Sequence, residues 1–132
     1  MACRCACDQA PVLVFACSGS NDVGELADRA ARKLDNSGVG KMYCLAGIGG
    51  RISGIVKSTE GAVALLVIDG CSLHCAGSCL EQAGFKDYHH VRIAELGFIK
   101  GSTDVSDENI NKVTAEGRLL LKEVYGEMIP YW

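Results

Sequence analysis

The chain has 132 residues, a net charge of −3 and 48% apolar residues, which together are typical of one globular domain. No apolar run reaches the roughly 18 residues that a membrane-spanning helix needs, and the absence of a basic block argues against nucleic-acid binding. No secretory signal is visible at the N-terminus. We therefore expect a cytoplasmic protein, in which eight cysteines indicate metal or redox chemistry more than structural disulfides.

Strands and helices are predicted to alternate along the chain. Apolar runs bounded by turn residues predict strands over residues 12–17, 41–45, 62–68 and 88–93. Apolar stripes and capping residues predict helices over residues 23–35, 51–60, 72–83 and 107–125. This alternation predicts an α/β fold, a single three-layer, Rossmann-like domain over residues 11–132 with about four mainly parallel strands and flanking helices. A cysteine-rich leader, residues 1–10, precedes the domain.

Three cysteines follow the first three predicted strands at equal spacing. Cys17, Cys44 and Cys71 are separated by intervals of 27 residues, close to the roughly 30 residues of a strand–helix–strand unit. The apolar run before Cys71, residues 63–68, is typical of a strand buried on both faces. Because the carboxyl ends of parallel strands meet at one edge of a sheet, where α/β proteins place their ligands, we expect a thiol cluster at this edge.

A fourth cysteine follows within the predicted helix over residues 72–83. Cys75 lies one helical turn after Cys71, so the two thiols are expected to share a face and to reach one metal ion. Cys79 lies about 12 Å beyond Cys71 along the helix axis, outside the same coordination sphere. Thiolates are natural ligands of zinc, copper(I) and iron–sulfur clusters, so the cluster favours a soft metal.

Histidines are weaker candidates for this site. His74 precedes Cys75 directly and points about 100° away from it on a helix, which favours a solvent-facing or supporting role. His89 and His90 are neighbours on a predicted strand, so their side chains point to opposite faces. At most one of them can face any given site, and a surface position for both is the alternative.

Glycine-containing turns follow the predicted strands and form candidate walls of the site. A loop before a helix N-terminus presents backbone N–H groups and the positive end of the helix dipole, which favours a small anionic ligand or a thiolate at Cys17. A tight turn with nothing bound requires the same residues and is the alternative. The candidate loop residues are Ser18, Gly19, Ser20, Asn21, Gly47, Gly49, Asp69 and Gly70.

Three segments together resemble the DGC domain family, which is named for an Asp-Gly-Cys motif. They are Cys17-Ser18-Gly19-Ser20-Asn21-Asp22-Val23-Gly24, then Cys44-Leu45-Ala46-Gly47-Ile48-Gly49, then Asp69-Gly70-Cys71 with Cys75-Ala76. The resemblance covers about residues 12–125 and implies a zinc site of four cysteines, here Cys17, Cys44, Cys71 and Cys75. It implies no established reaction. The remaining cysteines, Cys3, Cys5, Cys7 and Cys79, depart from the shared pattern.

Three hypotheses follow from these patterns. The first is a zinc-binding protein, used for metal sensing, storage or delivery if the site is open and for structure if it is closed, with Asp69 as a supporting group or loop anchor. The second is an enzyme of thiol redox or sulfur-transfer chemistry, in which the adjacent helix lowers the pKa of the nucleophile Cys17 and Cys71 or Cys75 resolves the intermediate. The third is a partner module or homo-oligomer that docks through the leader or the Tyr131-Trp132 tail.

Overall fold

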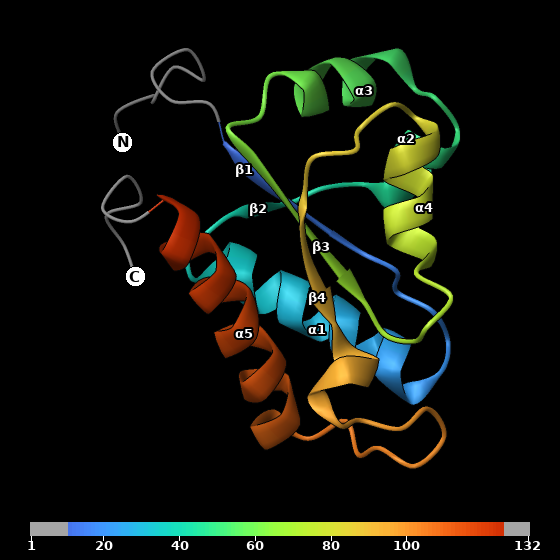
Figure 1. The fold of residues 1–132 in the computed structure, drawn as a ribbon, viewed down its shortest axis with the longest axis vertical. Helices are drawn as coiled ribbons and strands as arrows, with labels where there is room; N and C mark the ends of the chain where they lie inside the picture. Colours follow the sequence, from blue (N-terminus) through green and yellow to red (C-terminus); the bar gives the residue numbers. More distant parts are fainter. Residues whose placement is uncertain (1–10, 126–132) are drawn as a thin grey trace.

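The computed structural model describes residues 11–125, which form one four-stranded parallel sheet with helices on both faces (Figure 1). The strands are β1 (Val12–Ala16), β2 (Lys41–Met42), β3 (Ala64–Asp69) and β4 (His89–Arg92), in the spatial order β2-β1-β3-β4. The register pairs Val12 with Ala64 and Leu66 with His89, so β3 is a central strand between β1 and β4. The predicted α/β class and parallel, Rossmann-like architecture are confirmed.

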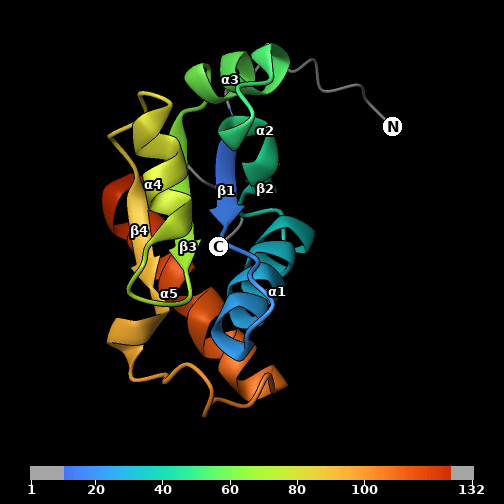
Figure 2. The same cartoon turned by 90° about the vertical axis from the view of Figure 1, so that its right-hand side faces the viewer.

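Two helical layers cover the sheet. The helices are α1 (Asp22–Asn36), α2 (Leu45–Gly49), α3 (Ser53–Glu60), α4 (Cys75–Gln82), the short 3-10 helix η1 (Ile93–Leu96) and α5 (Asp107–Tyr125). Figure 2, viewed from the side of α4, shows α4 in front of β3 and β4, with α5 behind them. None of the helices in the described part of the chain is both long and apolar enough to cross a membrane.

Alternating residues of the central strands divide the core into two halves. Val14 and Leu66 pack with α1 and α5 on one face, whereas Phe15 and Val67 pack with α2 and α4 on the other. All five residues of β1 and all six of β3 are buried, which explains why these strands are continuous apolar runs rather than alternating ones. The sheet therefore has an apolar core on both faces, and Cys17 and Cys71 from the loops at its carboxyl edge pack against this core as partly buried residues.

Residues 45–49 differ from the sequence prediction. We expected a strand to residue 45 and then a glycine-rich turn, but these residues form helix α2 with Cys44 at its N-cap. Gly47 lets α3 pack closely, because a Cβ there would lie 2.1 Å from Ile55 Cδ1. Gly47 and Gly49 therefore belong to a helix and do not form a loop wall.

The start of α4 also differs from the prediction. We expected a helix from residue 72, with Cys71 and Cys75 one turn apart on the same face, but α4 begins only at Cys75. His74 has a φ of 52°, in the left-handed region, and this conformation interrupts helical backbone before Cys75. The shared helical face of Cys71 and Cys75 is therefore wrong. The leader with Cys3, Cys5 and Cys7 and the Tyr131-Trp132 tail lie outside the described residues.

Candidate functional site

The structure places the four predicted cysteines at the carboxyl edge of the sheet. Cys17 follows β1 directly, and Cys44 and Cys71 each come two residues after the end of β2 and β3. Cys75 is the first residue of α4. Cys17 and Cys71 are half-buried and pack against the same core cluster, while Cys44 and Cys75 are exposed. The predicted arrival of three cysteines at one edge of a parallel sheet is therefore observed.

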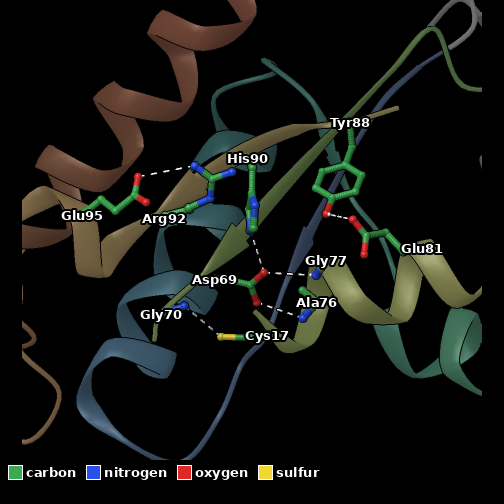
Figure 3. Close-up of polar contacts among 10 residues, drawn as sticks. All are labelled: Cys17, Asp69, Gly70, Ala76, Gly77, Glu81, Tyr88, His90, Arg92 and Glu95. Atoms are coloured by element: carbon green, nitrogen blue, oxygen red, sulfur yellow. Dashed lines mark hydrogen bonds and ion pairs between the residues drawn. The ribbon is translucent and has the colours of Figure 1, made fainter. Parts of the chain in front are cut away.

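Cys17 contacts the turn that carries Cys71. The backbone N–H of Cys17 donates to the carbonyl of Ile68 at 3.1 Å, and the Cys17 sulfur accepts the N–H of Gly70 at 3.4 Å (Figure 3). A Cβ at position 70 would lie 2.6 Å from the backbone carbonyl of Val23, so only glycine lets this turn approach the first turn of α1. The glycine of the Asp-Gly-Cys motif therefore brings the loops after β1 and β3 together.

The Cys17 thiol is not activated in the way that the sequence suggested. Burial is the largest influence and raises the pKa of Cys17, while the N–H groups of Gly70 and Gly19 oppose this increase. The charges of Asp69 and Cys71 raise the pKa of Cys17 further. The expected lowering by the helix N-terminus is therefore wrong, because desolvation outweighs the backbone dipoles.

The thiols do not form a preassembled metal centre. Within residues 11–125, no three Cys, His, Asp or Glu side chains are arranged so that they could hold a metal ion. The donor set nevertheless suits zinc chemically, because four thiols reach one edge of the sheet and the exposed Cys44 and Cys75 are unconstrained by burial. The zinc ligand set stays a prediction.

Asp69 is a buried clamp at the end of β3. Its side chain is only 1% exposed, and its two oxygens accept the N–H groups of Ala76 at 2.9 Å and Gly77 at 3.1 Å. His90 Nε2 lies 2.7 Å from the same carboxylate (Figure 3). The carboxylate thus satisfies two of the free N–H groups in the first turn of α4, and it fixes where that helix begins.

The surroundings of Asp69 keep it ionised. Burial alone would raise the pKa of this carboxyl, but the hydrogen bond from His90 and the N–H groups of Ala76 and Gly77 outweigh burial and lower the pKa. A buried carboxylate of this kind is tolerated only when its oxygens are paired and hydrogen-bonded. Asp69 therefore has a structural role beside the thiols, in agreement with the expected loop anchor.

His90 was missed as a specific site residue. Its side chain is 10% exposed, and the rings of His74 and Tyr88 lie edge-on to it, with centroids at 5.0 Å and 5.4 Å. The register pairs Val67 with His90, which places His90 on the same face of the sheet as Asp69. Knowing that β4 lies beside β3 would have placed His90 on the face of Asp69, but the strand order cannot be read from the spacing of residues in the sequence.

The polar side chains of the loop after β1 make hydrogen bonds within the chain, to the start of α1 and to Asp28. Asn21 Oδ1 accepts the N–H of Gly24 at 2.8 Å, and Asp22 accepts the N–H of Val23 at 2.9 Å. Ser18 has a φ of 54° and donates its hydroxyl to Asp28 at 2.8 Å. Two of the backbone N–H groups at the start of α1, those of Val23 and Gly24, are therefore already hydrogen-bonded by side chains of this loop. Binding of a small anionic ligand here stays a prediction.

Comparisons with known proteins agree with the motif pattern. A profile of the DGC domain matches residues 13–116. The chain is also similar to the "Anaerobic and virulence modulator AnvM" of Pseudomonas aeruginosa strain PAO1, with 36% identity over 88 residues that cover 67% of each chain. No solved structure matches the chain significantly.

Proposed function

This chain belongs to the DGC domain family, and from that premise we propose that it is a zinc-binding protein with Cys17, Cys44, Cys71 and Cys75 as thiolate ligands. The observation that carries the proposal is the arrival of these thiols at one edge of a parallel sheet. Four thiolates are a common ligand set for tetrahedral zinc, with bonds near ~2.3 Å. When bound, the metal would hold the loops after β1, β2 and β3 together.

The accessibility of the ligands favours exchange of the metal over a purely structural role. Cys44 and Cys75 are exposed, and the fully buried residues of the two core clusters include none of the four cysteines, although Cys17 and Cys71 pack against them. A metal held at such an edge can be gained and lost while the fold persists. We therefore favour metal sensing or delivery, and the word "modulator" in the name of the Pseudomonas relative fits such a regulatory role.

The proposal is tested by measuring zinc stoichiometry and affinity with purified, reduced protein. Cys3, Cys5 and Cys7 are first replaced by serine, because leader thiols could bind zinc themselves. In this background we expect about one zinc per chain, and replacing Cys17, Cys44, Cys71 or Cys75 by serine should weaken binding by at least about 100-fold, more than the loss of a merely orienting group. Cys79→Ser is the matched control and should bind as the parent does. Full zinc affinity in all four serine variants would overturn the ligand assignment.

Thiol redox or sulfur-transfer chemistry at Cys17 is a second candidate function. The observation that favours it is that two half-buried thiols, Cys17 and Cys71, pack against the same core cluster. The raised pKa of Cys17 lowers its thiolate fraction at neutral pH, so this candidate ranks second. Faster alkylation of Cys17 than of the half-buried Cys79, in metal-free protein at neutral pH, would reverse that order.

A further inference from the structure

The Asp69–His90 pair lies outside the proposed ligand set, but it is next to the loop of residues 70–74, which carries Cys71, and to the start of α4, where Cys75 lies. We infer that His90 is a positioning residue, which acts through Asp69 to hold the loop of residues 70–74 and the start of α4. This inference rests on the proposed function in one respect, because the loop and the start of α4 matter for zinc through Cys71 and Cys75. The effect of His90 on the backbone at the start of α4 can be measured in metal-free protein, independently of the proposed function.

Asp69 is connected directly to the first turn of α4. The carboxylate receives the N–H groups of Ala76 and Gly77, the two residues that follow Cys75. A carboxylate at this position also interacts favourably with the positive end of the helix dipole. The first turn of α4, and with it the Cα position of Cys75, therefore depends on where the Asp69 side chain points.

Asp69 is in turn held by His90. His90 comes from β4, and its Nε2 lies 2.7 Å from Asp69 Oδ2, the oxygen that also accepts the N–H of Gly77. The Tyr88 ring contacts that of His90, and Tyr88 donates its hydroxyl to Glu81 of α4 at 3.0 Å. A Cβ on Gly77 would lie 2.7 Å from the Tyr88 hydroxyl, so α4 packs directly on this side of β4.

His90 also contacts the loop of residues 70–74 through His74. The ring of His74 rests edge-on against His90, and the His74 N–H donates to the carbonyl of Cys71 at 3.2 Å. The carbonyl of His74 accepts the N–H of Ser78 at 2.9 Å within α4. His74 holds a left-handed φ that is unfavourable for a non-glycine residue, and such a conformation persists only where contacts enforce it. The contact with His90 is one such constraint, and it acts on a residue that lies between Cys71 and Cys75 in the sequence.

The order that His90 and Asp69 impose on the loop of residues 70–74 should affect zinc affinity. The four thiols are not preassembled within the described residues, so zinc binding would require movement of the loops after the strands and of the start of α4. A loop that is already ordered loses less conformational entropy on binding, and groups that orient ligands typically contribute 10–100-fold to metal affinity. His90 should therefore strengthen zinc binding without touching the metal.

The test compares His90→Leu with His90→Gln and Tyr88→Phe in the full chain. Leucine removes the donor to Asp69, glutamine retains an N–H donor, and the Tyr88 variant retains the ring beside His90 and removes the hydroxyl. Amide hydrogen exchange in reduced, metal-free protein is followed at Ala76 and Gly77, with Leu66 of β3 as the core reference. We expect His90→Leu to accelerate exchange at the two α4 amides more than at Leu66, and we expect glutamine to restore most of the protection.

Zinc affinity is measured on the same variants in the background lacking Cys3, Cys5 and Cys7. We expect roughly 10–100-fold weaker binding in His90→Leu, recovery in His90→Gln and the parent affinity in Tyr88→Phe. Equal acceleration of all amides, unchanged exchange at Ala76 and Gly77, or parent zinc affinity in His90→Leu would overturn the positioning role. Failure of the parent protein to bind zinc would instead overturn the proposed function, while the exchange data would still decide whether His90 holds the loop.

Discussion

The two cysteine loops on the central strands resemble one another in form but differ in how they are held. The loop of residues 17–21 follows β1, and the loop of residues 70–74 follows β3. Each carries a half-buried cysteine, and each contains a non-glycine residue with positive φ, Ser18 at 54° and His74 at 52°. Strained backbone beside two proposed ligands indicates that both loops are shaped by the surrounding structure.

The difference lies in the carboxylate that anchors each loop. Asp28, on α1, receives the Ser18 hydroxyl and pairs with Arg32 one turn away, and its side chain is 23% exposed. Asp69 is 1% exposed and connects β3, β4 and α4 through His90 and two backbone N–H groups. Water can replace the partners of Asp28 but not those of Asp69, so the loop after β3 depends more strongly on the rest of the fold.

The largest effect is expected from removing the buried anchor. Asp69→Ala leaves the N–H groups of Ala76 and Gly77 without their acceptor and removes the partner of His90, so the free energy of unfolding should fall by about 3 kcal/mol. Asp28→Ala is the matched control and should cost less than about 1 kcal/mol, because its ion pair is partly solvated. Urea unfolding of the metal-free variants measures both values. Equal costs would show that the two anchors do not differ as described.

A smaller effect is expected from the contact that brings the two loops together. Gly70→Ala places a Cβ 2.6 Å from the Val23 carbonyl, where backbone must move, so we expect a loss of about 2 kcal/mol. Gly54, on α3, has no atom within 4 Å of its Cβ position, and Gly54→Ala should stabilise the protein by about 0.5–1 kcal/mol through helix propensity. Thermal unfolding of the two variants should therefore shift in opposite directions. An unfolding temperature of Gly70→Ala equal to that of the parent would contradict the close approach of residue 70 to the Val23 carbonyl.

The smallest effect concerns Asp22, a third carboxylate anchor at the start of α1. Its oxygens accept the N–H groups of Gly101 and Thr103, and chiefly these bonds lower the pKa of Asp22. A lowered pKa means that the stabilisation is complete above the ordinary carboxyl pKa and is lost as pH falls through the lowered value. The amide resonances of Gly101 and Thr103 should titrate with a midpoint below that of an ordinary aspartate, and Asp22→Asn should abolish this titration. A midpoint at the ordinary aspartate value would show that Asp22 does not anchor Gly101 and Thr103.

Much of the fold could be predicted because its determinants are local. Buried parallel strands require continuous apolar runs, and the run before Cys71 identified the central strand β3 directly. The last helix was predicted over residues 107–125, and α5 spans Asp107–Tyr125. The positions of Cys17, Cys44 and Cys71 after three strands followed from the same pattern, since strand order does not alter which edge holds the carboxyl ends.

The features that the sequence did not reveal are set by tertiary contacts. The start of α4 was misplaced because a buried carboxylate from β3 caps the helix at Cys75, and helical periodicity does not register such a contact. His90 could not be distinguished from His89 without knowing that β4 lies beside β3. The direction of the pKa shift at Cys17 depends on burial, which opposes the dipole effect expected from its position before α1.

The most direct test of the zinc site is to identify the cysteines that zinc protects. The full chain is reduced, alkylated under native conditions with and without one equivalent of zinc, and analysed by peptide mass spectrometry. Four thiolates that enclose a metal react slowly, so the account predicts zinc-dependent protection of Cys17, Cys44, Cys71 and Cys75, with Cys79 unaffected. Protection of the leader cysteines alone, or no protection while zinc is bound, would contradict a metal site at the carboxyl edge of the sheet.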